Sequence, residues 1–388
     1  MCHDALVLWS FGVTAVCVFP FVASPRSAWR SLWMGAVLLV ALVGLSACQD
    51  RDPVTIGVLL PLDGPGSSVG LEVRDGMLLA IEQINDRGGL NGRNLALTVE
   101  DAGTTAAETA AAVERLAAQD PLMIVSATSR VSIDALPTVT RLERLMFAVV
   151  ASAIELTDAG EWVYRYWPLP EDEVPGMLAL LDMDPGDRVG AAYLDDPYGQ
   201  SVHRALAVAL EDRGVELVGR PFPLATQDFD DVVLTLADTG SFVAIGFDVH
   251  LRAILRALDQ ADYPGAVISN TAAALPAVTQ MSEADGLFVA APAIYNRAFS
   301  FASETAKNYE DRFDKTFNHY AANGYDLMTL VAGAIVEQPM EQASLKSFLE
   351  RGFVYSGLFG TVSLQPGESD ISFPLFRAQI QNGALAYQ

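Results

Sequence analysis

Short apolar runs alternate with segments of helical periodicity along most of this sequence. Residues 55–60 read TIGVLL, a continuous apolar run of the length expected for a buried strand. Apolar side chains then recur at helical spacing over residues 69–86, and this stretch ends at Gly88-Gly89, where a left-handed residue is least costly as glycine. The pattern therefore predicts a strand followed by an amphipathic helix.

The same alternation occurs in two successive runs, which are separated near residues 166–170. The strands predicted in the first run cover residues 55–60, 95–99, 123–125 and 146–151, and the helices cover 69–86, 105–119 and 133–144. The strands predicted in the second run cover 189–194, 215–219, 242–247, 267–269 and 287–290, and the helices cover 200–212, 229–236 and 251–260. Helical stretches at 299–318 and 325–337 follow, and then strand-like stretches at 361–364 and 373–380. Because such alternation builds parallel sheets covered by helices on both faces, we predict an α/β protein with two lobes.

The N-terminal residues have the composition of an export signal. Arg26 and Arg30 precede an apolar run over residues 34–45, which ends in Leu45-Ser46-Ala47-Cys48. A basic region, an apolar core and small residues before a cleavage point are typical of a secretory signal peptide. We therefore expect residues 1–48 to be a signal peptide. An earlier apolar stretch at 5–23 is either an additional membrane span or, as a simpler explanation, the result of a start site placed too early.

The cysteine at the end of this segment resembles the last residue of a bacterial lipobox. That resemblance implies that Cys48 becomes the lipid-bearing first residue of the mature protein; the alternative is an ordinary membrane anchor with a chance cysteine. Gln49 follows it, and resemblance to Gram-negative sorting rules favours the outer membrane over the inner one. We expect a periplasmic, lipid-anchored protein.

The composition is that of a folded and strongly acidic protein. The chain has 388 residues, of which 51% are apolar, 19% are charged, and Asp plus Glu outnumber Lys plus Arg by 48 to 24, a net charge of −24. Without residues 1–48 there are 22 basic and 47 acidic residues, a net charge of −25. A surface this negative repels phosphate backbones and argues against nucleic-acid binding.

Cysteine and histidine usage argues against a metal site. The cysteines are Cys2, Cys17 and Cys48, so the part after Cys48 has no internal disulfide and no cysteine ligands. The four histidines are far apart in sequence and form no metal-binding motif. We expect no metal and no cofactor.

Two catalytic motifs in the loop after the first strand are interpreted as coincidental. Gly66-x-Ser68-x-Gly70 matches a nucleophile elbow, but Ser68 lies eight residues beyond the strand end at Leu60, whereas the elbow serine follows its strand directly. Gly64-x-Gly66-x-x-x-Gly70 loosely matches a dinucleotide fingerprint, with Asp101 as the ribose acid at a spacing longer than the usual ~20 residues. We expect a binding-cleft loop and no enzyme activity.

Several stretches, in order along the chain, resemble one protein family. They are IGVLLPLDGPGSSVG (56–70), AIEQINDRGGLNGRNLALTVEDAGT (80–104), DDPYGQSVHRAL (195–206), TQDFDDVVLTL (226–236), YDLMTLVAGAI (325–335) and GTVSLQPGES (360–369). By these stretches the chain resembles the type I periplasmic solute-binding proteins of the branched-chain amino acid (Leu/Ile/Val) and amide class. The resemblance implies two doubly wound Rossmann-like lobes, joined by three hinge crossovers, that close over a small ligand. It places lobe one at 54–167 plus 293–355 and lobe two at 168–292 plus 356–388.

The resemblance also implies ligand-binding residues. The family's first-lobe serine, in a turn before a helix, matches Ser129, whose hydroxyl and neighbouring amides would hold a carboxylate. The next contact falls on Ala151 and Ser152, and the tyrosine that opens a second-lobe helix matches Tyr198. For Ser129 the alternative is a plain helix cap, and for Tyr198 a packing residue.

Two departures from the family pattern leave the ligand open. The family often has an acidic residue after the strand that ends near Ser269, where it takes the ligand's ammonium. This chain has Asn270 and Thr271 there, and Thr271 is kept as a candidate ligand contact. Asp248, which follows another strand, is a candidate for the missing charge, or else a solvated loop residue. Val69 replaces the aromatic residue common in the first glycine loop. An amino acid, an amide, a short carboxylate or an aromatic acid therefore all remain candidates.

The resemblance implies a non-catalytic receptor that captures a small polar solute and delivers it to an inner-membrane ABC importer. The alternative is an envelope lipoprotein of the same fold that regulates another protein, for example a cell-wall synthase activator or a sensor. A cleft filled by a bulky apolar side chain would favour that alternative, and Trp162 and Trp167 near the first crossover keep it open.

Overall fold

Five parallel strands form the first sheet of the computed structural model, which describes residues 52–156, 160–292, 299–336 and 338–387. The strand order is β2-β1-β3-β4-β5, and each pair of neighbours is parallel. The strands are β1 (Val54–Leu60), β2 (Leu95–Asp101), β3 (Ile124–Ala127), β4 (Met146–Val149) and β5 (Val163–Tyr166). β3 and β4 are buried along their whole length, as expected for strands covered on both faces.

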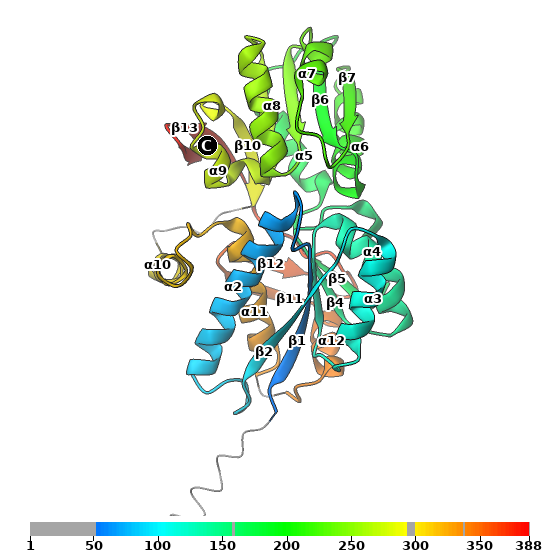
Figure 1. Cartoon of the computed structure of the whole chain (residues 1–388), viewed down its shortest axis with the longest axis vertical. Helices are drawn as coiled ribbons and strands as arrows, with labels where there is room; N and C mark the ends of the chain where they lie inside the picture. The colour runs from blue at the N-terminus through cyan, green and yellow to red at the C-terminus, as the bar shows by residue number, and fades with distance from the viewer. Residues whose placement is uncertain (1–51, 157–159, 293–298, 337, 388) are drawn as a thin grey trace, which may run out of the picture. The chain divides into compact units, whose positions relative to one another are not determined.

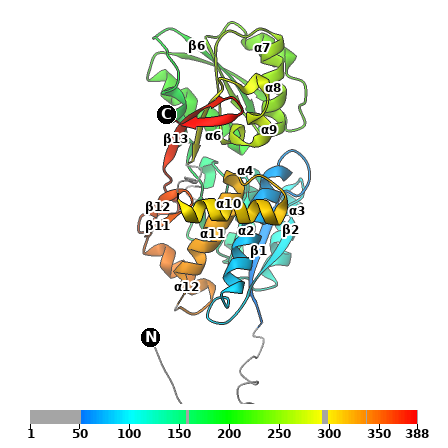
Figure 2. The ribbon, with the colours of Figure 1, turned by 90° about the vertical axis from the view of Figure 1, so that its left-hand side faces the viewer.

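Helices cover both faces of this sheet (Figure 1). One face packs against α2 (Ser67–Asp86) and α11 (His319–Ala334), and the other against α3 (Ala106–Ala117) and α4 (Ser129–Arg141). Figure 2 shows α10 (Ser300–Phe313) and α11 beside α2. We call the first sheet and these helices the first lobe.

Two glycines allow α2 and α11 to approach closely. A Cβ atom on Gly76 would lie 1.9 Å from the carbonyl oxygen of Ala321, and one on Gly324 would lie 2.2 Å from that of Val73. Real side chains do not come so close, so neither position accepts a larger residue without moving a helix. The packing fixes α11, and with it Tyr320, against the first sheet.

A second sheet has the strand order β14-β13-β10-β9-β8-β6-β7. β6 (Arg188–Leu194), β7 (Glu216–Phe222), β8 (Ser241–Ile245), β9 (Ala266–Ser269) and β10 (Phe288–Pro292) are parallel, and β13 (Leu375–Gln381) and β14 (Ala384–Tyr387) add an antiparallel edge. α5 (Pro170–Leu178) and α6 (Pro197–Glu211) pack on one face, and α7 (Asp230–Leu236) and α8 (Asp248–Gln260) on the other. This second lobe confirms the predicted two-lobed, doubly wound α/β fold.

The C-terminal segment packs differently from the expected lobe limits. The expected limits place residues 356–388 in lobe two, but the hairpin of β11 (Phe353–Gly357) and β12 (Gly360–Leu364) belongs to the core of the first lobe, as does Ile371. The carbonyl of Arg165 on β5 accepts from the amide of Ile371 across 3.2 Å. Figure 2 shows that the segment after β12 returns to the second sheet at β13. We therefore propose that the third crossing lies near residue 374 rather than at 356, because residues 361–364 pair with β11 and not with the C-terminal strand.

Most elements lie within a few residues of their predicted positions, with informative exceptions. The helix predicted over 133–144 begins at Ser129, and the one predicted over 325–337 begins at His319. β5, α5, α12 (Gln342–Glu350), β11 and β14 were not predicted. In the described part of the chain no helix is long and apolar enough to cross a membrane.

Candidate functional site

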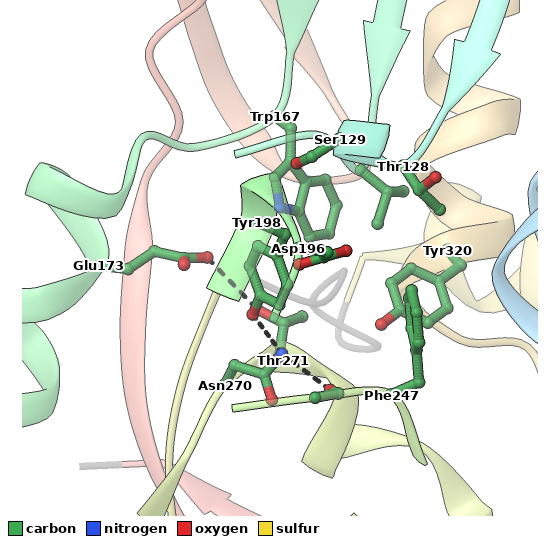
Figure 3. Close-up of a pocket in the computed structure, with 12 residues that line it drawn as sticks. Thr128, Ser129, Trp167, Glu173, Asp196, Tyr198, Phe247, Asn270, Thr271 and Tyr320 are labelled. Atoms are coloured by element: carbon green, nitrogen blue, oxygen red, sulfur yellow. Dashed lines mark hydrogen bonds between the residues drawn. The ribbon is translucent and has the colours of Figure 1, made fainter. Parts of the chain in front are cut away.

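A small cavity lies where strands of both sheets end (Figure 3). In the first lobe, the lining residues follow β3, β4 and β5 or lie on α11; in the second lobe, they follow β6, β8 and β9 or lie on α5 and α6. The carboxyl ends of parallel strands are where open α/β sheets bind ligands. The lining residues are Thr128, Ser129, Val150, Trp167, Glu173, Asp196, Tyr198, Gly246, Phe247, Asn270, Thr271 and Tyr320.

The free volume of this cavity is about 30 Å³. That is room for one or two water molecules, whereas a solute pocket usually measures several hundred Å³. The lobes are held together at one side, where the amide of Ile154 donates to Oγ of Ser201 across 3.2 Å and Arg204 pairs with Glu155 at 2.9 Å. A solute would therefore enter only if these lobes move apart or side chains rearrange.

Two β-branched residues in the cavity wall have left-handed backbone angles. Thr128 has φ of 74° and Val150 has φ of 49°. Each directly follows a buried strand, β3 or β4, and turns the chain at the cavity wall. A positive φ at such residues is strained and persists only where the surrounding structure imposes it, most often at functional sites.

The first-lobe side of the cavity presents a helix N-terminus. Ser129 begins α4, is 2% exposed, and accepts a hydrogen bond at Oγ from the amide of Ala153 across 3.1 Å. Thr128, in the N-cap position, makes no side-chain capping bond. First-turn amides without a cap, together with the helix dipole, favour a negatively charged group at this point.

The second-lobe side presents an amide and a phenol in contact. Nδ2 of Asn270 donates to the hydroxyl of Tyr198 and also to the carbonyl of Gly246, the latter across 3.3 Å. Burial raises the pKa of Tyr198 well above its ordinary value, so the hydroxyl stays protonated at every physiological pH. Its proton remains available to an acceptor in the cavity.

Glu173 adds a buried carboxyl group to the same side. It is 1% exposed, and Oε1 accepts a hydrogen bond from Oγ1 of Thr271 across 3.4 Å. Oε2 is buried and has no hydrogen-bond partner among the described residues. Burial raises the pKa of Glu173 to about 8, so at neutral pH this carboxyl is largely protonated.

Asp196 is a second carboxyl in the wall. It is the N-cap of α6, and its Oδ1 accepts from the amide of Gly199 across 2.9 Å. Burial raises its pKa to about 6. The lining contains no lysine, arginine or histidine, so the side chains of the wall carry only acidic charge.

The structure brings together part of the set predicted from sequence. Ser129, Tyr198 and Thr271 line the cavity, while Ala151 and Ser152 are buried just beyond Val150 without lining it. Oγ of Ser152 has no hydrogen-bond partner among the described residues. Cys48 lies outside the described residues.

Asp248 lies in a different place from the one expected for a ligand contact. It is absent from the cavity lining, and its Oδ1 accepts from Oγ of Ser68 on α2 across 3.1 Å. Ser68, the residue of the elbow motif, sits in the first turn of α2. Neither ring nitrogen of His319 has a hydrogen-bond partner among the described residues. The part of the chain that the structure describes contains no cluster of acidic, histidine or cysteine residues that could hold a metal ion.

Sequence reasoning missed Glu173, Asp196, Phe247 and Tyr320 as wall residues. Glu173 lies in the unpredicted helix α5, which contains Pro175 and so lacked a helical pattern. Asp196 carried one usable signal, because Asp followed by Pro197 is a typical helix start. Phe247 and Tyr320 looked like ordinary core residues, and Trp167 was singled out only as a possible apolar filler of the cleft.

Two lobes with parallel sheets and a polar cavity at their strand ends are the architecture of a two-lobed binding protein. A profile of the family described as periplasmic binding protein matches residues 53–384. The chain belongs to this family, as its sequence motifs indicated.

Individual relatives are distant but cover most of the chain. A "Leu/Ile/Val-binding protein homolog 7" of Brucella abortus (strain 2308) is 25% identical over 324 residues, 79% of this chain and 81% of its own. The substrate-binding protein LivJ of Streptococcus pneumoniae, solved in complex with isoleucine, has a TM-score of 0.74 at 16% identity and covers 87% of this chain and 100% of its own. A solute-binding protein of Rhodopseudomonas palustris BisB5, solved in complex with 3,4-dihydroxybenzoic acid, has a TM-score of 0.77 at 18% identity. The match covers 87% of this chain and 96% of that protein. These similarities establish the shared fold.

Proposed function

We propose that this chain captures a small polar solute between its two lobes and delivers it to an ABC importer in the inner membrane. The observation that carries the proposal is the cavity itself, because both lobes contribute buried polar groups to one small volume at their strand ends. Unpaired buried polar groups cost about 1–3 kcal/mol each, so a wall of this kind is favourable where a ligand completes the hydrogen bonds.

Binding and closure are coupled in this proposal. The solute would be held by Ser129 and the start of α4 in the first lobe, and by Tyr198, Asn270 and Thr271 in the second. A ligand that contacts both lobes stabilises the closed form relative to the open one. The importer would then recognise that form.

The solute class is narrowed by the cavity and by related proteins. A helix N-terminus on one side suits a carboxylate, and the relatives solved with isoleucine and with 3,4-dihydroxybenzoic acid both bind carboxylic acids. Ala151 and Ser152 lie directly behind the wall, where they would support the backbone next to the solute's carboxylate. We propose an amino acid, an amide or a short carboxylate.

Lipid anchoring remains a proposal from the sequence. The order of basic, apolar and small residues before Cys48 supports export and attachment at that cysteine. A Cys48→Ser variant should lose incorporation of labelled palmitate when expressed in a Gram-negative host. Labelling equal to that of the natural chain would contradict the lipoprotein assignment.

The alternative of a regulatory lipoprotein without a solute is not favoured. Trp167 does line the cavity, but the wall also buries Glu173, Ser129, Asn270 and Thr271. A cleft sealed by an apolar filler has no need for these groups. Trp162 lies elsewhere, with Nζ of Lys346 4.9 Å from its ring centroid.

Thermal unfolding tests the proposal directly. The full-length chain, purified in detergent, is screened against amino acids, amides, ureas, polyamines and aromatic acids. A solute present at 100 times its dissociation constant should add about 2.7 kcal/mol to the free energy of unfolding and raise Tm by several degrees. No shift with any compound would contradict solute binding.

A further inference from the structure

We propose that Glu173 binds a positively charged amino group of the solute, so that this cavity selects ligands that carry an ammonium. The inference rests on the proposed function and narrows the solute class of the same site. It assigns the role to a residue that none of the sequence motifs marked, in place of Asp248.

The position of Glu173 supports this role. Its helix, α5, begins at Pro170 and places the side chain against the end of β9, where Thr271 lies. Figure 3 shows the carboxyl group directed toward Tyr198 and Thr271. An ionised carboxylate offers about four acceptor positions. Thr271 fills one, and Oε2 has no partner among the residues that the structure describes.

The other acidic group of the wall is already engaged. Asp196 caps α6 and accepts from the amide of Gly199. Asp248 is held by Ser68 outside the lining. Glu173 is therefore the wall carboxyl that has a buried oxygen without a hydrogen-bond partner among the described residues.

No basic side chain compensates Glu173 within the wall. The ionisable groups that face it are Asp172 on the same helix, Tyr198 on α6 and Tyr320 on α11. All of these are neutral or acidic, and burying a lone carboxylate among them is costly. A cation supplied by the ligand would offset that cost, since a buried ion pair is favourable when both partners are present.

Binding of an ammonium has a definite proton balance. At pH 7 the free cavity holds Glu173 largely as the neutral acid. Pairing with R-NH3⁺ requires the carboxylate, so one proton leaves Glu173 for solvent as the ammonium–carboxylate pair forms. Affinity should therefore rise with pH up to about 8, the pKa of this carboxyl in the free protein.

The test compares ligands that differ only in the amino group. L-Leucine is paired with 4-methylpentanoate, L-phenylalanine with 3-phenylpropanoate, and isopentylamine and phenethylamine are added as amines without a carboxylate. Calorimetric titrations use the full-length chain, its Glu173→Gln variant and the control Glu171→Gln, an exposed glutamate in the same helical turn. The introduced amide reproduces the shape and neutrality of the protonated Glu173 side chain, so the Glu173→Gln variant should fold normally.

We expect at least one amino compound to bind and its desamino counterpart to bind tenfold or more weakly. Glu173→Gln should weaken that ligand at least tenfold, whereas Glu171→Gln should stay within twofold of the natural chain. Titration in two buffers of different ionisation enthalpy should show about one proton released by the natural chain and none by Glu173→Gln.

Other outcomes separate this inference from the proposed function. If only compounds without an amino group bind, or if Glu173→Gln binds an amino ligand as the natural chain does, the role of Glu173 is overturned and solute binding stands. If the amino ligand binds without proton release, the proton balance is overturned, because Glu173 would then be ionised before the ligand binds. If neither these compounds nor the wider set of amides and aromatic acids binds, the proposed function fails as well.

Discussion

The hydroxyl of Ser68 donates a hydrogen bond to Oδ1 of Asp248 across 3.1 Å and joins α2 of the first lobe to α8 of the second. The two residues are 180 positions apart in sequence, so only the approach of the lobes brings them together. In the sequence, Ser68 matches a nucleophile motif and Asp248 is a candidate ligand contact. Because this contact links the two lobes, we propose that both residues stabilise lobe closure.

Loss of this contact should weaken solute binding modestly. Ser68→Ala removes a hydrogen bond made across the lobes, which destabilises the closed form by about 1 kcal/mol and should raise Kd about fivefold. Ser67→Ala is the control, because Oγ of Ser67 donates within its own turn to the carbonyl of Gly64. Titration calorimetry with a cognate solute measures both variants, and equal effects would argue against a role in closure.

The ion pair between Arg204 and Glu155 should contribute only at low salt. Both side chains are about half exposed, and such pairs are worth about 0–1 kcal/mol. Arg204→Ala should therefore raise Kd up to about fivefold at ~10 mM salt and leave it unchanged at ~1 M, where the charges are screened. Arg213→Ala, an exposed arginine just beyond the end of α6, serves as the control. A loss that persists at high salt would contradict the electrostatic explanation.

Ser129 should matter for binding more than for folding. Ser129→Ala removes the hydroxyl at the start of α4, and we expect Kd to rise fivefold or more, a cost of about 1 kcal/mol. The protein should still fold, although loss of the acceptor for the Ala153 amide should lower Tm by a few degrees. Thr140→Ala, at an exposed position of the same helix, is the control. Unchanged affinity in Ser129→Ala would remove this residue from the site.

His319 should make the protein sensitive to acid. Burial lowers the pKa of its imidazole to about 3, whereas the unfolded chain takes up a proton near pH 6.5. The unfolded state binds more protons between these values, so the free energy of unfolding should decrease as pH falls from 6.5 toward 3. His319→Phe keeps a flat ring beside Trp167 and cannot be protonated. Urea unfolding at several pH values should show a shallower decrease in this variant; an identical slope would contradict the account.

Glu173 should have the opposite effect at higher pH. Its pKa is raised to about 8 in the folded state, so the folded state binds a proton that the unfolded chain releases between about pH 4.5 and 8. The stabilising contribution is complete below pH 4.5 and is lost as pH rises toward 8. Glu173→Gln should flatten the decrease in Tm between about pH 6 and 8 in the absence of ligand. A slope equal to that of the natural chain would show that Glu173 ionises without cost.

The alternation of the fold could be predicted because strands such as β1 and β4 are continuous apolar runs and helices such as α2 have a clear periodic pattern. Prediction failed where local patterns conflict with tertiary packing. β5 carries the buried Arg165, which pairs with Asp370 from a distant part of the chain, and α5 is interrupted by Pro175. The pairing of β12 with β11 depends on the core around Asp326, which accepts from the amide of Leu358 across 2.8 Å.

The site was predictable only where a residue lies in the loop after a predicted strand, at a position that the family resemblance marks. Ser129, Tyr198 and Thr271 meet that condition, and they line the cavity. Tyr320 and Glu173 reach the cavity from helices of other parts of the chain, and only the folded arrangement reveals them. Asp248 meets the condition and still lies elsewhere, because the cavity is closed by Phe247 one residue earlier.

A crystal structure with the stabilising solute bound tests the central claim most directly. The account predicts density for the solute in the cavity, touching Ser129 of the first lobe and Tyr198 and Glu173 of the second, with the Ser68–Asp248 contact intact. A solute bound on one lobe alone, or outside the ends of β3, β4, β8 and β9, would contradict binding between the lobes.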